Sequence, residues 1–172
     1  MAAGNTYTPI AQYTLTASQA SISFSSIPSI YTDLVLVCSA KSLNTGTDSF
    51  GISVNGVTSG YSRTYLQGDG SNMQSGRQTA QIRIVSDYVM GTSGTQEYGV
   101  WTWNFMNYAS TTNYKTVLFR GNNTSNAGGF NVEANVYLHP SNSAITTITL
   151  ATMNGPNWAI GSTFVLYGIA EA

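Results

Sequence analysis

Apolar and polar residues alternate along most of this chain with a period of two, which is typical of β-strands that bury one face. Phe50, Ile52 and Val54 alternate with glycine and serine, and the segment Trp101–Phe105 carries an aromatic residue at every second position. The run Asp33–Ser39 is continuously apolar at its centre, which indicates a central strand buried on both faces. The pattern therefore predicts β-structure almost from end to end.

About nine or ten short strands, separated by turns rich in Gly, Asn and Ser, are expected, and helical periodicity is nearly absent. These elements favour an all-β fold, an antiparallel two-sheet β-sandwich. Jelly-roll-like connectivity is preferred over an immunoglobulin-like one, because the Cys and Trp pattern of the latter is missing. No linker divides the chain, so we expect a flexible N-terminal arm over residues 1–5 and a single β-sandwich domain over residues 6–172.

Two local patterns give sharper predictions. Asn55-Gly56 is a strong signal for a β-hairpin turn, so the strands on either side of it are expected to pair with each other. From Phe130 to Leu138 the even-numbered residues are apolar, and their side chains are expected in the core. The odd-numbered residues of the same segment, three of which are polar or charged, are then expected to face water.

The composition is unusually poor in charge. Only 8% of the residues are Asp, Glu, Lys or Arg, the formal net charge is −1, and Ser, Thr, Asn and Gly make up 75 of the 172 residues. Six scattered basic residues offer no phosphate-neutralising patch, so we expect no nucleic-acid partner. The longest apolar run, Leu34–Cys38, is far short of the ~18 residues of a membrane span, so no membrane association is expected.

The single cysteine and the N-terminus bear on where the protein works. Cys38 lies within an apolar segment, and we interpret it as a small buried residue rather than a reactive thiol. The opening residues have neither a basic nor an apolar region, so they do not form a secretory signal. A polar coat without an export signal favours a protein that folds in a host cytoplasm and works outside it after lysis, as a virion component does.

Groups for catalysis are scarce, since the chain has one His, one Cys and seven carboxylates. His139 stands before Pro140, at the end of a predicted strand, and is expected to be a solvent-facing loop residue rather than a catalytic base. The segment Gly68–Asn72 offers one Asp, one hydroxyl and one amide, which are few oxygen ligands for a calcium site. Its composition is more typical of a turn. We expect no enzyme activity, no cofactor and no metal.

Aromatic residues offer the one binding signal. Exposed aromatic rings stack on sugars in carbohydrate-binding sandwiches, and the candidates here are Tyr61, Tyr65, Tyr98, Trp101, Trp103, Tyr108 and Tyr114. The alternation of Trp101 and Trp103 with polar residues favours a place in the core for both. Trp158 follows a Gly-Pro-Asn segment and is expected to be the most exposed tryptophan. In a loop it would either anchor a partner or cap one end of the sandwich.

Several segments together carry a resemblance to a known family. They are Phe24–Pro28, Tyr31–Val37, Phe50–Gly56, Tyr61–Gly70, Ala144–Leu150, Gly161–Ile169 and, at the start, Thr6–Ala11. In these segments the chain resembles small virion structural proteins of tailed bacteriophages, of the type common in marine and cyanobacterial phages. The resemblance implies a component of a phage particle that is made in the host cytoplasm.

Two positions on a particle fit this resemblance. A capsid decoration (cement) protein would bind the major capsid protein on the outer surface of the icosahedral shell, often as a homotrimer. A tail-fibre or receptor-binding tip would instead be a lectin-like sandwich that binds host surface glycans. The small size and the absence of a shaft repeat favour decoration.

Under the decoration hypothesis, the partner-binding residues are expected to be Thr6, Tyr7, Pro9, Tyr13 and Trp158. The segment that contains the first four would add a strand to the exposed sheet edge of a neighbouring subunit. An equally good alternative makes the same residues the first strand of their own sandwich. Contacts with the shell are expected to be polar and to depend little on salt, because the chain carries few charges.

Overall fold

The computed structural model describes residues 6–44, 48–89, 98–123, 131–153, 155 and 157–170. In this part of the chain all regular structure is β-strand, and no helix is long and apolar enough to cross a membrane. The strands are β1 (Tyr7–Thr14), β2 (Ser21–Phe24), β3 (Asp33–Ala40), β4 (Asp48–Val54), β5 (Tyr61–Gly68), β6 (Met73–Gln81), β7 (Ile84–Val89), β8 (Gly99–Met106), β9 (Lys115–Asn123), β10 (Asn131–His139), β11 (Ile148–Thr152) and β12 (Thr163–Ile169). The expected arm over residues 1–5 lies outside the described residues.

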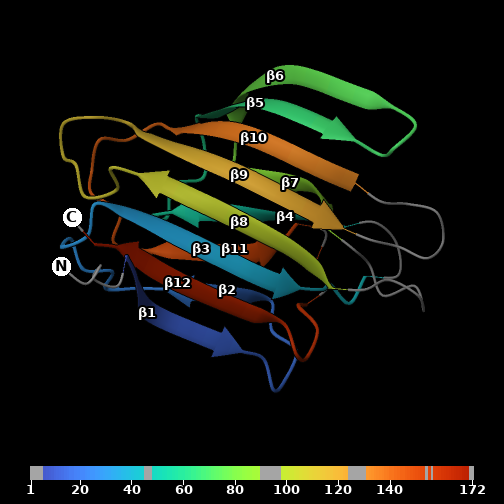
Figure 1. The fold of residues 1–172 in the computed structure, drawn as a ribbon, viewed down its shortest axis with the longest axis horizontal. Coiled ribbons are helices and arrows are strands. Elements are labelled where there is room, and N and C mark those ends of the chain that lie inside the picture. The colour runs from blue at the N-terminus through green and yellow to red at the C-terminus, as the bar shows by residue number, and fades with distance from the viewer. Residues whose placement is uncertain are drawn as a thin grey trace.

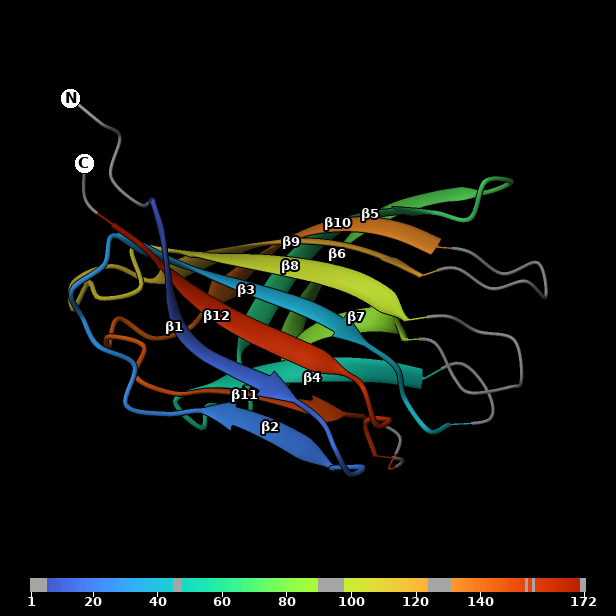
Figure 2. The ribbon, with the colours of Figure 1, turned by 60° about the horizontal axis from the view of Figure 1, so that its bottom comes forward.

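The strands form two antiparallel sheets that face each other. One has eight strands in the order β1-β12-β3-β8-β9-β10-β5-β6, and the other has four in the order β2-β11-β4-β7. Figure 1 looks onto the eight-stranded sheet from outside, with the four-stranded sheet behind it, and Figure 2 shows the two layers from the side. The predicted all-β, two-sheet sandwich is confirmed, while jelly-roll connectivity is still an interpretation of this strand order.

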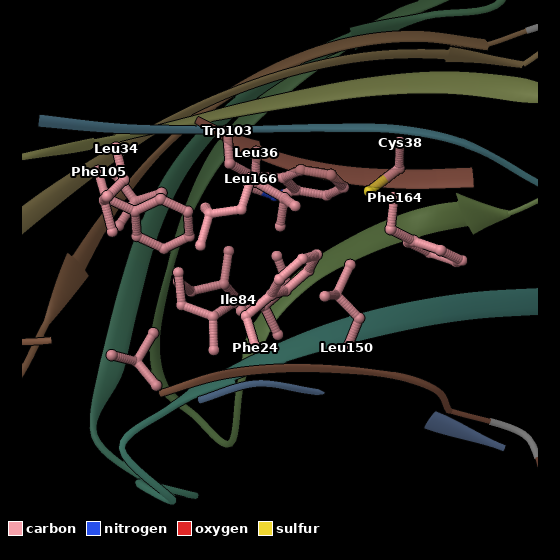
Figure 3. Packing of buried hydrophobic residues seen from close by; sticks show 14 of the residues in the cluster. Phe24, Leu34, Leu36, Cys38, Ile84, Trp103, Phe105, Leu150, Phe164 and Leu166 are labelled. Carbon is pink, nitrogen blue, oxygen red and sulfur yellow. The ribbon is translucent and has the colours of Figure 1, made fainter. Parts of the chain in front are cut away.

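The core lies between the two sheets and is rich in aromatic rings. Trp101, Trp103 and Phe105 are all buried, as their alternation predicted. Phe50 reaches up from the four-stranded sheet, and its ring meets those of Trp101 and Trp103 edge to face at 5.0 and 5.4 Å. Cys38 is buried in the same core, beside Phe164 in Figure 3, and burial raises the pKa of its thiol well above the usual value.

The turn at Asn55-Gly56 does not join a hairpin, so that prediction is wrong. Both residues have positive φ, as the signal predicted, but β4 and β5 belong to different sheets. The Asn55 side chain holds the turn against the segment before β11 instead. Its Oδ1 accepts hydrogen bonds from the backbone N–H groups of Thr146 and Thr147 at 2.9 and 3.0 Å.

The prediction for strand β10 is wrong, because its polar side is buried and its apolar side is exposed. Glu133, Asn135 and Tyr137 are buried, whereas the apolar side chains of Val132 and Val136 are 59% and 47% exposed. Pairing with β9 explains this, because Tyr137 lies opposite the buried Val117 and Asn135 lies opposite the buried Phe119. Directly opposite residues of antiparallel strands point to the same face, so the register of β9 carries the polar side of β10 inward.

The buried polar side chains of β10 bond to one another. The Asn135 amide donates to Glu133 at 3.1 Å and lies 3.3 Å from the Tyr137 hydroxyl. His139, the last residue of β10, is also buried rather than in a solvent-facing loop, and its ring lies against Tyr61 with centroids 5.2 Å apart. The hydrogen bonds of Asn135 lower the cost of burying these polar side chains, whereas both ring nitrogens of His139 are buried without a hydrogen-bond partner among the described residues.

Candidate interaction surface

The outer face of the eight-stranded sheet carries a group of large apolar side chains. They come from the neighbouring strands β5, β6, β8, β9 and β10, in the upper part of Figure 1, and each is between 37% and 79% exposed. The residues are Leu66, Met73, Val100, Met106, Leu118, Val132, Val136 and Leu138. We call these eight residues the apolar face.

Strand register brings the members of the apolar face together. Leu118 of β9 lies opposite Val136 of β10. Val100, Val132 and Met73 lie in one row across the sheet, with Asn122 and Gly68 between them. Polar residues such as Arg120 and Asn122 stand in the same rows as these apolar side chains. A group of exposed large apolar side chains with polar residues among them is typical of a surface that binds another molecule.

One end of the apolar face is hollowed into a groove of about 800 Å³. Its apolar lining comes from Leu66, Met73, Val100, Val132 and Ala134. Its polar lining comes from Thr102, Arg120, Asn122 and the turn between β5 and β6, together with Gln67 and Glu133, whose side chains are buried. The volume lies within the ~300–1,000 Å³ of typical ligand sites, and the mixture of an apolar floor with a few polar groups is also typical of them.

The turn at Gly68–Asn72 forms one wall of the groove. Asp69 Oδ1 accepts hydrogen bonds from the backbone N–H groups of Asn72 and Ser71 at 2.6 and 2.9 Å, and these bonds lower the pKa of the Asp69 carboxyl. The interpretation of this segment as a turn is therefore confirmed. In the described residues no group of three or more His, Cys, Asp or Glu side chains could hold a metal ion.

The outer face of the other sheet is very different. In β2 the buried Ile22 and Phe24 alternate with Ser21 and Ser23, which point outward. The outward positions of β11 and β4 include Thr149 and two serines. At the described outward positions of β2, β4 and β11 the side chains are small, and the exposed large aliphatic side chains of the described strands lie on the eight-stranded sheet.

Four of the predicted partner-binding residues lie at the start of the chain's own sandwich. Tyr7, Pro9 and Tyr13 belong to β1, which pairs with β12 at one edge of the eight-stranded sheet, and the carbonyl of Thr6 accepts a hydrogen bond from Ala170. Of the two alternatives for this segment, the first strand of the same domain is the one observed. These residues lie at the opposite edge of the sheet from the groove.

Tyr13 bonds within its own domain. Its hydroxyl donates to the carbonyl oxygen of Ser23 at 3.1 Å, and its ring meets that of Phe24 edge to face at 5.1 Å. Because Ser23 and Phe24 belong to β2, the edge of the other sheet, this side chain joins the two sheets where they end. Tyr13 therefore has a role in stability whether or not it binds a partner.

Trp158 is buried, with 1% of its surface exposed, so the prediction of an exposed tryptophan is wrong. Its backbone N–H donates to the carbonyl of Gln19 at 2.7 Å, which holds the segment against the sandwich. Its ring packs edge to face against Phe50 and Phe164 at 5.4 and 5.3 Å. Of its two possible roles, capping the end of the core is the one observed.

The seven aromatic candidates for sugar stacking do not assemble into one exposed platform. Tyr61, Trp101, Trp103 and Tyr108 are buried. The ring of Tyr65 is covered by the Arg63 guanidinium at 4.8 Å. Tyr98 and Tyr114 are exposed, but they stand just before β8 and β9, at opposite ends of β8.

Sequence reasoning missed the apolar face, although its signal was present. The apolar alternation in β10 predicts a strand with this row in the core, but in the structure the same residues lie on the outer face. Chemically, the face can bury aliphatic side chains against a partner and offers few charges. Comparison of the chain with protein-family models, curated proteins and solved structures found no match.

Proposed function

We propose that this chain is a structural protein of a phage particle, a capsid decoration protein that binds the outer surface of the shell through the apolar face. One observation carries the proposal, namely the contrast between the two outer faces of the sandwich. The described outward positions of β2, β4 and β11 carry small side chains, whereas the eight-stranded sheet exposes the eight large apolar side chains of the apolar face.

The strand order supports the same class of function. We infer a jelly roll in which β1-β12-β3-β8 faces β2-β11-β4-β7, because strands that follow each other along the chain, such as β1 and β2 or β3 and β4, lie in opposite sheets. The pairs β5-β6 and β9-β10 then extend one sheet. Jelly rolls are common in viral capsid and lectin domains, so this topology fits a particle protein.

The chemistry of the proposed contact differs from the sequence-based expectation of mainly polar contacts. Aliphatic side chains such as Leu118 and Val136 lie at the middle of the face and would lose their water on binding. The favourable free energy would come mainly from this apolar burial, with polar side chains at the rim. Weak dependence on salt is still expected, because the face carries few charges.

A tail tip that binds host glycans is the weaker alternative. It called for an exposed aromatic platform, and four of the seven candidate aromatic residues are buried in the core. The apolar face has aliphatic rather than aromatic side chains, which suit a protein partner better than a sugar. A homotrimer on the shell stays a prediction from the resemblance.

Cryo-electron microscopy of the intact parent phage tests the proposal. We expect density for an 18.3 kDa sandwich at icosahedrally related sites, with the eight-stranded sheet turned toward the shell. A shell without this density and a sandwich found only at the tail would contradict decoration and favour host recognition. Sandwiches on the shell that present the four-stranded sheet to it would contradict the proposed binding face.

A further inference from the structure

We propose that the groove at the end of the apolar face receives an apolar segment of the partner protein, and that a carboxylate of this segment pairs with Arg120. The inference rests on the proposed function only for the identity of the partner as the shell protein. The groove, its lining residues and the charge of Arg120 are properties of this chain and do not depend on the identity of the partner.

Arg120 lies on the floor of the groove. In the sheet it stands between Thr102 of β8 and Ala134 of β10, and Leu66 follows in the same row on β5. All four residues line the groove, and Arg120 is exposed. A guanidinium among aliphatic neighbours strongly favours an anionic partner, because a planar carboxylate can accept two of its hydrogen bonds.

Four of the other five cations already have contacts with named groups. Arg63 donates to Gln78 at 2.8 Å, and Lys115 donates to two backbone carbonyls at 2.7 and 3.0 Å. Lys41 lies over the Tyr98 ring, and Arg83 lies 3.7 Å from the Met153 sulfur. Within the described residues, no hydrogen bond or ion pair occupies the guanidinium of Arg120 or of Arg77. Both lie on the outer side of the eight-stranded sheet.

A second copy of this chain fits the groove less well than a different protein. The structure describes four carboxylate side chains, and each accepts a hydrogen bond within its own chain: Asp33 from the backbone of Asn107, Asp48 from Ser42, Asp69 within its turn and Glu133 from Asn135. Glu133 and Asp48 are also buried. Among these four described carboxylates, none is both exposed and without a hydrogen bond, so charge complementarity favours a foreign segment that brings a carboxylate of its own.

The shape of the groove suits a short extended segment. Leu66, Val100 and Val132 offer apolar contacts, and the exposed amide of Asn122 can bond to the backbone of the segment. A segment with apolar residues on both sides of an Asp or Glu would place the carboxylate over Arg120. The lining of the groove thus predicts the residue types of the binding segment, although it does not predict the exact sequence.

A titration followed by NMR tests the groove with the isolated protein. The probes are the capped tripeptides acetyl-Leu-Glu-Leu-amide and acetyl-Leu-Gln-Leu-amide, added to the ¹⁵N-labelled full chain. We expect the Glu peptide to shift the amide signals of Leu66, Val100 and Ala134 and to bind about two- to fivefold more tightly than the Gln peptide. This preference should disappear in Arg120→Gln and persist in Arg77→Gln, a matched arginine outside the groove.

The outcomes separate this inference from the proposed function. Equal affinity for the two peptides, no shift at the groove, or an equal effect of the two Arg variants would overturn the inference. A preference for the Glu peptide that depends on Arg120 supports it, even if the protein does not bind purified shells, in which case the proposed function fails alone. If size-exclusion chromatography with light scattering shows a dimer that Arg120→Gln dissociates, the occupant is a second copy and the inference is wrong.

Discussion

At the scale of single residues, His139 shows how burial changes the chemistry of the only histidine. Its ring is fully buried at the end of β10, and neither ring nitrogen has a hydrogen-bond partner among the described residues. Burial, and to a smaller extent the positive charge of Lys115, lowers the pKa of His139 to about 4. The imidazole is therefore neutral in the folded protein at pH 7 and is poorly placed to act as a base.

This pKa predicts how stability depends on pH. An unfolded His139 takes up a proton below about pH 6.5, whereas the folded one stays neutral down to about pH 4. Its contribution to stability is thus complete above pH 6.5 and decreases as the pH falls toward 4, by about 1–3 kcal/mol in total. Urea unfolding between pH 7.5 and 4 should show a smaller decrease for His139→Phe, which keeps a ring against Tyr61. Equal decreases in both proteins would contradict the assignment.

Trp158 gives a second prediction at this scale. Because its ring fills the end of the core, Trp158→Ala should lower the free energy of unfolding by about 3–5 kcal/mol. The nearby Ile160 is 61% exposed, so Ile160→Ala serves as the control and should change stability by less than about 1 kcal/mol. Urea unfolding measures both. A tryptophan that anchors a partner from an exposed loop would behave like Ile160.

At the scale of elements, β10 shows that an alternating pattern marks a strand without choosing its buried side. Both rows of this strand can be buried, since one is aliphatic and the other contains Tyr137 and side chains that bond to one another. The register with β9 makes the choice, because Tyr137 lies opposite the buried Val117. The aliphatic row is left on the outside, where it becomes part of the apolar face.

Two neighbouring substitutions test which side of β10 is buried. Val136→Ser should change the free energy of unfolding by less than about 1 kcal/mol, because the side chain is half exposed. Tyr137→Ser should cost at least about 3 kcal/mol, because it leaves a cavity next to Asn135. Urea unfolding of both variants measures these changes in the free energy of unfolding. The reverse order of effects would show that the aliphatic row lies in the core.

At the scale of the whole molecule, the two outer faces of the sandwich differ in the side chains that they expose. The described outward positions of β2 and β11 include serine and threonine, whereas the eight-stranded sheet presents the apolar face. The four extra strands β5, β6, β9 and β10 supply six of the eight residues of that face. They thus extend the sheet and at the same time create the surface that we propose for binding.

Two double variants, one on each outer face, test which face binds the shell. Leu118→Lys with Val136→Lys should weaken binding to purified shells at least about tenfold, because two charges would have to leave water at the middle of the interface. Ser23→Lys with Thr149→Lys, on the four-stranded sheet, should leave the affinity unchanged. Co-sedimentation with shells measures binding, and melting temperatures confirm folding. Equal losses in both double variants would contradict the proposed face.

The sequence by itself determined the class of the fold and much of its core. The stripe from Trp101 to Phe105 and the burial of Cys38 are both observed as predicted. The turn at Gly68–Asn72 is also local, because it depends on hydrogen bonds between residues two and three apart. Alternation and turn chemistry act over a few residues, so they can be interpreted without knowing where the rest of the chain lies.

Only the tertiary structure decided which strands pair and which residues lie outside. Asn55-Gly56 makes the expected turn, yet its strands join different sheets, and Trp158 is buried because Gln19, far away in the sequence, pairs with it. The outward row of β10, and with it the apolar face and the groove around Arg120, follows from pairing with β9 and β5. Such pairings join residues far apart in the chain, and a shift of one residue would exchange the two faces of a strand.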